Sequence, residues 1–489
     1  MYLSKRNIYI LLFAYVFIVI LIYSSNNFNG INYFINDIRK YFYGDNNVQD
    51  DKNNFRIINV SGARFVKPYK NLQKDFIHFG NALFLKVKKG STVKDAAKLS
   101  IGYTNFYRIN RLRNALMEYN GLKQDIVKND MLLYIPDSIP SIISGLKNFK
   151  RSDLTYTRGL YFTGTSAGSE NFLNLLPKLR DIGINTIVFD AKDVTGEVNY
   201  YSNVANVLKY NTHEKRAIDN IGKMIRALKE QGIYTIARIA VFRDHLLCLK
   251  NANFAIKSKR TGRIWNLGAK EIWCDPSNKY VQEYNIDIAV ELAEKGVDEI
   301  QFDYIRFPTK GDLRDADYAY HYGKMSKESV ITLFLQKAYG EISKRNTLFS
   351  VDIFGVVSWG KEIDIEKTGQ RVEALSRYCD VISPMLYPSH FDDDFDGFAK
   401  PGDEPYHFIL EGTRRTKLLA NGKPVRPWLQ AFGWRVPASS YNENYIIKQI
   451  AACRDAGAQG YLFWNASNSY DLVYRTLNNL TSLKKGGNK

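Results

Sequence analysis

Cysteine and histidine are scarce in this sequence, which contains four cysteines and six histidines among 489 residues. The cysteines lie far apart, no CxxC pair is present, and no histidine stands at zinc-ligand spacing, so a structural zinc site is not expected. Cys248 and Cys274 flank one predicted loop and could pair in an oxidising compartment, although we favour free, half-buried thiols.

Motifs for nucleotides and nucleic acids are also missing. No GxGxxG fingerprint follows an early predicted strand, which weakens the case for a dinucleotide-binding open sheet. The formal net charge is +18, but no dense Arg/Lys cluster alternates with aromatic residues and no nucleic-acid docking motif is present. We therefore expect no nucleic-acid partner, and we interpret the charge as a solvated surface that favours anionic polymers or membrane surfaces.

Long apolar runs are rare as well, and the clearest one extends from Ile8 to Tyr23 after Lys5 and Arg6. Its length of about 16 residues is at the short end for a membrane-spanning helix. The sequence that follows is a poor cleavage site, so we expect an uncleaved signal anchor, with a cleaved signal peptide as the alternative. The positive-inside rule then places residues 1–7 in the cytoplasm and exports the body to the periplasmic or cell-surface side of the membrane.

What is present is a globular composition, with 45% hydrophobic and 24% charged residues. Patterning divides the body into a partly disordered tether, a small α+β domain, a linker, a large α/β domain and a basic tail, at 24–80, 81–140, 141–157, 158–480 and 481–489.

The small domain is predicted to contain a strand and turn, two short helices with an Asn-Gly corner, and a closing strand, in FLKVKKGST, VKDAAKLS, LMEYNGL and MLLYIP. These segments resemble a LysM module, although Tyr103 to Arg113 is longer and more basic than that family usually carries. The resemblance implies binding of N-acetylglucosamine-containing glycans, notably peptidoglycan. A small spacer without a ligand is the alternative.

In the large domain, eight short apolar segments alternate with amphipathic helices. One helix carries Ile218, Ile221, Ile225 and Leu228 on one face and stops at Gly232; another carries Val281, Ile288 and Leu292 and stops at Gly296. This alternation indicates parallel strands joined by crossovers, and eight of them favour a closed (β/α)8 TIM barrel. The predicted strands are Arg158 to Gly164, Thr186 to Asp193, Tyr234 to Phe242, Asp298 to Pro308, Leu348 to Gly355, Asp380 to Pro388, Val425 to Phe432 and Gly460 to Ser467.

Polar residues gather toward the carboxyl ends of several of these strands, where the active sites of such barrels lie. Because side chains alternate along a strand, Asp190, Arg238, Asp303 and Asp352 are predicted to point into one barrel mouth. Later strands and loops add Tyr387, His390, Gln430 and Trp464, and Asp275 follows the third strand. Carboxylates, an arginine and aromatic rings are typical of a carbohydrate site.

The block from Arg158 to about Asn468 resembles a bacterial family of glycoside-hydrolase-like TIM-barrel domains. The segments that carry the resemblance are RGLYFTGTSAGS, IVFDAKDVTGEVNYYS, DEIQFDYIRFP, SVDIFG, ISPMLYPSHF, RPWLQAF and GYLFWNAS. The resemblance implies hydrolysis of an O-glycosidic bond by two carboxylates, with no metal or organic cofactor required. By likeness to retaining glycosidases, Asp303 would be the nucleophile and Asp352 the general acid/base, with Asp190 in reserve.

The remaining candidates would bind substrate. Arg238 and Arg306 would keep Asp303 charged, or form structural ion pairs. Tyr387, His390 and Gln430 would contact the sugar, Trp464 would stack beneath it, and Asp275 would contact an outer sugar. Purely structural roles are also open, namely loop capping by His390 or Asp275, a structural Asp352 and core packing of Trp464.

Different functions are compatible with the sequence as well. GTSAG (Gly164 to Gly168) fits a GxSxG elbow with Ser166 as the nucleophile of an esterase, completed by His390 or His407. A metal-dependent esterase or deacetylase could use Asp190, Asp193 and His390. A non-catalytic glycan-binding, wall-anchoring protein is the third possibility, and a mouth plugged by Gly311 to Lys327 would favour it. The expected partner in each case is a cell-envelope or extracellular glycan, and the oligomeric state is unknown.

Overall fold

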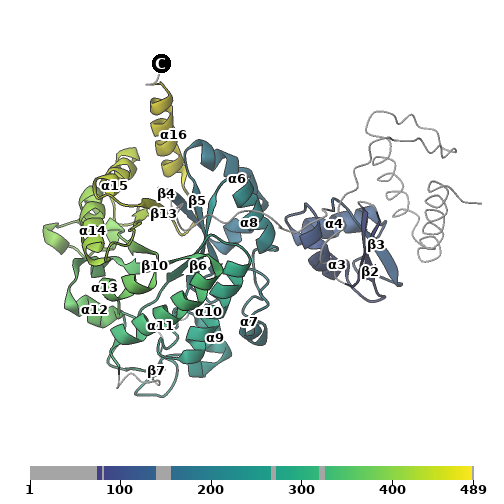
Figure 1. Ribbon diagram of the computed structural model, residues 1–489, viewed down its shortest axis with the longest axis horizontal. Coiled ribbons are helices and arrows are strands. Elements are labelled where there is room, and N and C mark those ends of the chain that lie inside the picture. Colours follow the sequence, from purple (N-terminus) through teal and green to yellow (C-terminus); the bar gives the residue numbers. More distant parts are fainter. Residues whose placement is uncertain (1–73, 80–81, 139–155, 266–270, 319–324, 487–489) are drawn as a thin grey trace, which may run out of the picture. The chain divides into compact units, whose positions relative to one another are not determined.

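The computed structural model describes residues 74–79, 82–138, 156–265, 271–318 and 325–486 (Figure 1). The chain forms two compact units that divide between Gly145 and Leu146. The helices of the described residues are all too short or too polar to cross a membrane. The predicted anchor at residues 8–23 lies outside the described ranges.

The first unit is a three-stranded antiparallel sheet, β1 (Phe76–Phe79), β2 (Ala82–Val87) and β3 (Met131–Ile135), with helices α3 (Val93–Ser100) and α4 (Ile109–Tyr119). Thr92 caps α3 by accepting a hydrogen bond from the Asp95 amide. The buried Asn120 side chain bonds the backbone of Tyr134 and so joins the end of α4 to β3. The predicted strands and helices are thus present. However, β1 lies in the segment that we expected to be tether.

The second unit is a closed barrel of eight parallel strands in the order β10-β11-β12-β13-β4-β5-β6-β8, which confirms the predicted (β/α)8 TIM barrel. The β10 strand pairs with β8 and so closes the ring. The strands are β4 (Thr157–Phe162), β5 (Thr186–Lys192), β6 (Tyr234–Ala240), β8 (Glu299–Asp303), β10 (Leu348–Phe354), β11 (Val381–Met385), β12 (Trp428–Gln430) and β13 (Gly460–Trp464).

Helices surround this barrel (Figure 1). Ile221, Ile225 and Leu228 of the predicted apolar face are buried on α8, whereas Ile218 is buried before the helix begins. Gly232 follows α8 with a φ of 66°, which suits glycine. The helices are α5 (Gly164–Ala167), α6 (Glu170–Asp181), α7 (Ala205–Tyr210), α8 (Ile221–Glu230), α9 (His245–Lys250), α10 (Lys279–Glu294), α11 (Lys327–Ile342), α12 (Glu362–Thr368), α13 (Val372–Leu375), α14 (Pro405–Leu419), α15 (Glu443–Asp455) and α16 (Asp471–Gly486). A small pair, β7 (Lys257–Ser258) and β9 (Ala316–Asp317), joins the loops after β6 and β8.

The two faces of β8 explain how the site is positioned. Phe302 packs outward on Phe334 of α11, with ring centroids 5.6 Å apart. On the opposite face, Glu299 contacts Arg426 in the barrel interior, and both side chains are buried. Asp303 continues that inward face at the carboxyl end of the strand. Because side chains alternate along the strand, the carboxylate of Asp303 lies at the mouth of the barrel.

Candidate active site

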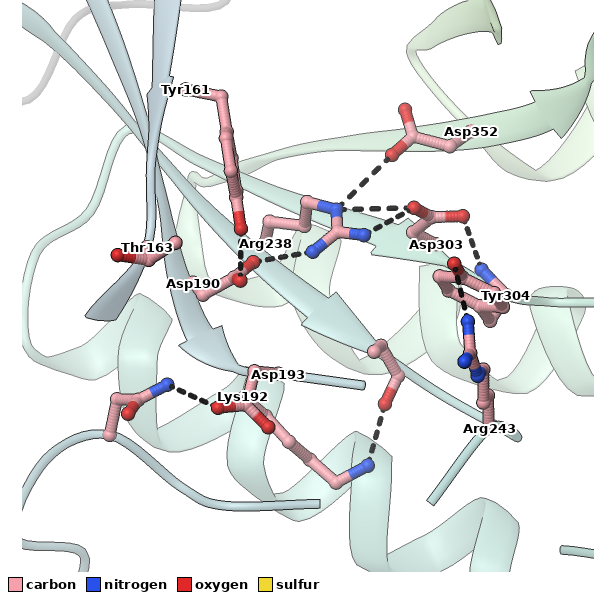
Figure 2. A network of polar contacts seen from close by, with 12 residues as sticks. Tyr161, Thr163, Asp190, Lys192, Asp193, Arg238, Arg243, Asp303, Tyr304 and Asp352 are labelled. Atoms are coloured by element: carbon pink, nitrogen blue, oxygen red, sulfur yellow. Dashed lines mark hydrogen bonds and ion pairs between the residues drawn. The ribbon is translucent and has the colours of Figure 1, made fainter. Parts of the chain in front are cut away.

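Arg238 joins three carboxyl groups that come from three different strands (Figure 2). Its Nη1 lies 2.5 Å from Asp190 Oδ1, its Nη2 lies 2.6 Å from Asp303 Oδ2, and its Nε lies 3.9 Å from Asp352 Oδ2. Asp190 and Arg238 are also register partners on β5 and β6. The predicted convergence of these four side chains is therefore present in the structure.

Asp303 is held as a hydrogen-bond acceptor on both oxygens. Arg238 donates to Oδ2 from Nη2 and from Nε, the latter at 3.1 Å, and the Tyr304 amide donates to Oδ1 at 2.5 Å. Tyr304 has a left-handed backbone with a φ of 54°, which turns the chain sharply just after the strand. The side chain of Asp303 is 4% exposed, so it is positioned firmly but has little contact with solvent.

Asp352 lies deeper than Asp303. It is 0% exposed, Trp428 Nε1 donates to its Oδ1 at 2.8 Å, and its Oδ2 has no hydrogen bond among the described residues. Burial, followed by the charge of Asp303, raises the pKa of Asp352 well above its usual range. Because Asp303 Oδ2 and Asp352 Oδ2 both lie within 4 Å of the same Arg238 Nε, these oxygens are at most about 7 Å apart.

Asp190 is bound on both oxygens as well. Tyr161 Oη donates to Asp190 Oδ2 at 2.5 Å, and Arg238 bonds the other oxygen. Burial raises the pKa of Asp190 to about 6, although the charge of Arg238 and the bond from Tyr161 act in the opposite direction. A carboxyl group with that pKa changes protonation state near neutral pH, as a general acid must.

Sequence reasoning missed Tyr161 and Trp428, the two side chains that position these carboxyl groups. Both lie in predicted strands, and their ring centroids are 6.4 Å apart across the barrel interior. Parity along β4 and β12 could have found them, because Tyr161 shares a face with Gly159 and Trp428 shares one with Gln430. That signal was weak because aromatic residues in strands usually belong to the core.

An aromatic wall, defined here as Tyr387, Trp464, Phe432, His390 and Trp434, leads from the carboxyl groups to the surface. Neighbouring ring centroids are 5.2 to 5.5 Å apart from Tyr387 to Trp464, from Trp464 to Phe432, from Phe432 to His390 and from His390 to Trp434. Desolvation by these rings, with the charges of Lys310 and Arg435, lowers the pKa of His390 to about 4. Trp434, which the sequence analysis did not select, is 56% exposed.

Two predicted substrate contacts already have partners within the protein. Gln430 is fully buried, accepts from the Ser389 amide and donates to the Phe432 carbonyl, so it ties two loops together. Asp275 is also buried and caps its own turn by bonding the amide and hydroxyl of Ser277. Both residues therefore have structural roles, because these polar atoms are used in holding loops and turns.

We had expected Arg306 to pair with Asp303, but the described residues show no ion pair between them. Its guanidinium stacks between Trp273 and Phe354, each ring centroid being 4.9 Å away, and Nη1 donates to the Phe307 carbonyl. The ion pair with Asp303 is made by Arg238, because the left-handed turn at Tyr304 directs the chain away before Arg306 is reached.

The GTSAG segment serves packing. Ser166 Oγ bonds Thr163 Oγ1 at 3.1 Å, and His407 bonds Asp396, so no Ser-His pair forms from these residues. A Cβ at Gly164 would stand 2.2 Å from Asn199 Cγ, which explains the need for glycine there. The small residues thus allow the loop after β5 to pack closely against this segment.

The residues considered for a metal-dependent esterase do not form a metal site. Asp190 lies on β5 whereas His390 belongs to the aromatic wall, and the described residues contain no group of three or more His, Cys, Asp or Glu side chains placed to hold a metal.

In the segment considered as a plug, β9 pairs with β7, and residues 319–324 lie outside the described ranges. Cys248 and Cys274 are free and buried, with their sulfur atoms 3.2 Å apart.

Several known proteins are similar to this chain. Three solved structures resemble the chain: a hypothetical protein from Ruminiclostridium thermocellum ATCC 27405 (34% identity, 40% of this chain and 96% of that one, TM-score 0.36), the spore cortex-lytic enzyme SleL of Bacillus cereus (11%, 82% and 86%, 0.39) and α-L-fucosidase isoenzyme 2 from Paenibacillus thiaminolyticus (14%, 68% and 49%, 0.47). No curated protein matches. Residues 159–470, well over half of the chain, match the family described as "Putative glycosyl hydrolase domain". The chain therefore belongs to this glycosyl hydrolase domain family.

Proposed function

We propose that the barrel hydrolyses an O-glycosidic bond in a cell-envelope or extracellular glycan. The observation that carries the proposal is the set of three carboxyl groups gathered around Arg238 at the barrel mouth. Glycosidases need two carboxyl groups close together, one of which donates a proton, and the raised pKa of Asp190, about 6, suits the donor.

Asp303 is the proposed nucleophile, and the acid/base role passes from Asp352 to Asp190. Asp352 is fully buried beneath Trp428 and cannot touch a leaving group without rearrangement, whereas Asp190 is 3% exposed and has a pKa of about 6. Asp303 attacks the anomeric carbon while Asp190 gives its proton to the departing glycosidic oxygen. Asp190 then takes a proton from the water that hydrolyses the glycosyl ester, which returns both groups to their starting states.

The pKa of Asp190 predicts how activity depends on pH. Because the acid must be protonated, turnover should fall as pH rises through about 6. Asp190→Asn should remove this limb of the pH profile and most of the activity, whereas Asp352→Asn should keep the limb. Rates of reducing-end release from pH 4 to 9 check this. A limb near pH 6 that persists in Asp190→Asn would assign the acid role to another group.

The aromatic wall predicts a substrate of several sugar units. Trp434→Ala should raise KM on the order of tenfold for long glycans and much less for short ones, because only a long chain reaches the exposed ring. Tyr280→Ala is the matched control, since that ring is 67% exposed at the start of α10 and belongs to no proposed site. Kinetics on a series of oligosaccharide lengths measures the effect, and an unchanged KM at every length would contradict it.

The low exposure of the carboxyl groups favours a second candidate, a barrel that binds a glycan without cleaving it. One experiment separates the two. The chain from about Phe55 onward is incubated with purified peptidoglycan and a panel of polysaccharides, and released reducing ends are measured. Hydrolysis requires release from at least one of them, and binding without release would support the second candidate.

We further propose that the protein is membrane-anchored and extracytoplasmic, with the first unit acting as a peptidoglycan-binding LysM-like module. The support is the charged and apolar pattern of residues 1–23 and the segments that resemble LysM. Fractionation of cells followed by protease treatment from outside tests the location, and co-sedimentation with peptidoglycan tests the module.

A further inference from the structure

Arg306 forms no ion pair with a carboxylate of the described residues, although it lies close enough to Asp303 and Glu271 for their charges to oppose the lowering of its pKa by burial. By contrast, two deeply buried arginines of the barrel interior have acidic partners: Arg238 contacts Asp190 and Asp303, and Arg426 contacts Glu299. No carboxylate in the described part of the chain lies within 4 Å of Arg306, and its buried Nε has no hydrogen bond there. A half-buried charge is costly unless it is paired, so an arginine that makes no contact with a carboxylate at this position needs an explanation.

Aromatic rings hold this guanidinium in place. It lies 4.9 Å from the centroids of Trp273 and Phe354 and 5.7 Å from that of Tyr304, the residue that follows Asp303. Stacking on aromatic faces fixes the plane of a guanidinium and leaves its edge for an anion. Burial lowers the pKa of Arg306 from its usual value, but an arginine stays charged at neutral pH.

A second guanidinium lies on the same tyrosine. Arg243 stands 5.3 Å from the Tyr304 ring centroid and donates to Tyr304 Oη at 3.1 Å (Figure 2). Its acidic neighbour, Glu271, is 3.8 Å away and partly exposed, so that pairing is loose. Two arginines therefore flank Tyr304, the residue that follows the proposed nucleophile in the chain.

The order of the strands separates Arg243 and Arg306 from the aromatic wall. Arg243 and Arg306 follow β6 and β8, and Phe354 ends β10, whereas the wall comes from β11, β12 and β13 on the far side of β10. A sugar placed over Asp303 would thus meet rings along one side and two cations along the other. A planar arginine fork matches the geometry of a carboxylate, which is a common anionic substituent of sugars.

Resting on the proposed function, we propose that Arg306 and Arg243 bind a carboxylate on the sugar at the cleaved bond, so that the substrate is an acidic glycan. The carboxylate can belong to the sugar ring, as in a uronic acid, or to a lactyl ether on the ring. The net charge of +18 would attract such polymers over longer distances. The two arginines would select among the polymers that arrive.

The test measures binding in the full chain with Asp303→Asn, which stops turnover. The probes are polygalacturonate, which has ring carboxylates, and peptidoglycan glycan strands freed of peptides by an amidase, which have lactyl carboxylates. Each is offered before and after chemical reduction of its carboxyl groups, at 150 mM salt. We expect at least one acidic probe to bind tenfold more tightly than its reduced form, and the probe that does so identifies the source of the carboxylate.

Variants assign this preference to the site. Arg306→Gln should bind the acidic and reduced forms within twofold of each other, whereas Arg180→Gln on the surface of α6 removes the same charge and should keep the preference. Arg243→Gln should weaken the preference for the acidic form, so this variant tests the inference if Arg306→Gln fails to fold. The inference is overturned if the starting protein binds neither probe, if it binds both forms equally, or if Arg306→Gln keeps the preference. The acidic form could be preferred while the unmutated protein releases no reducing ends. That result would contradict the proposed hydrolysis but would still support binding of a sugar carboxylate by the two arginines.

Discussion

Asp303→Asn is expected to reduce turnover at least about 1,000-fold, because an amide cannot replace the carboxylate that attacks the anomeric carbon. The fold should survive the change. Asparagine keeps the shape of aspartate, its side-chain oxygen can still accept from Arg238, and Arg238 retains its contact with Asp190. Release of reducing ends from the most responsive glycan measures turnover, and thermal unfolding checks that the protein is native.

Asp181→Asn is the matched control, since it makes the same chemical change at an exposed position in the last turn of α6. It should behave as the unmutated protein in both measurements. Near-normal turnover by Asp303→Asn would remove the proposed nucleophile. Loss of the native fold in that variant would instead identify the contact between Asp303 and Arg238 as mainly structural.

Arg238→Met should destabilise the barrel by about 3 to 5 kcal/mol at pH 8, because it leaves buried carboxyl groups without their shared cation. Methionine fills a similar volume, so the loss would report charge more than packing. Denaturant unfolding measures the free energy. Arg454→Met, an exposed arginine paired with its neighbour Asp455, is the control and should change stability little.

The loss should shrink as pH falls. Burial already raises the pKa values of Asp190 and Asp352, and Arg238 is the cation that opposes this in both groups. Without it, both pKa values rise further above the unfolded value near 3.8, so the folded state binds protons that the unfolded chain does not. The free energy of unfolding of Arg238→Met should therefore increase between pH 8 and about pH 5. Equal destabilisation at both pH values would contradict this account of the site.

Strand parity was enough to predict the central four residues of the site. Asp190, Arg238, Asp303 and Asp352 each occupy the inward register at the carboxyl end of a strand, and a parallel barrel brings such positions together. The same rule selected Gln430, which does point inward. It could not show that the amide of Gln430 is used by Ser389 and Phe432, because those bonds depend on loops with no periodic pattern.

Loop geometry also explains where the predictions and the structure differ. Arg306 lies only three residues after Asp303, yet the left-handed turn at Tyr304 separates their side chains. Trp434 lies in a loop after β12, where sequence spacing does not indicate exposure. Strand β1 was missed because its four residues gain their partner only by pairing with β2.

By itself, the sequence determined that this chain folds into a (β/α)8 barrel and that acidic side chains gather at one rim, because both follow from local periodicity. Only the tertiary structure decided how deeply each acid lies and which side chains hold it. Trp428 donates a hydrogen bond to Asp352 from two strands away, and Tyr161 donates one to Asp190 from a neighbouring strand. Burial and pKa arise from side chains far apart in the sequence, so they exist only once the barrel has closed.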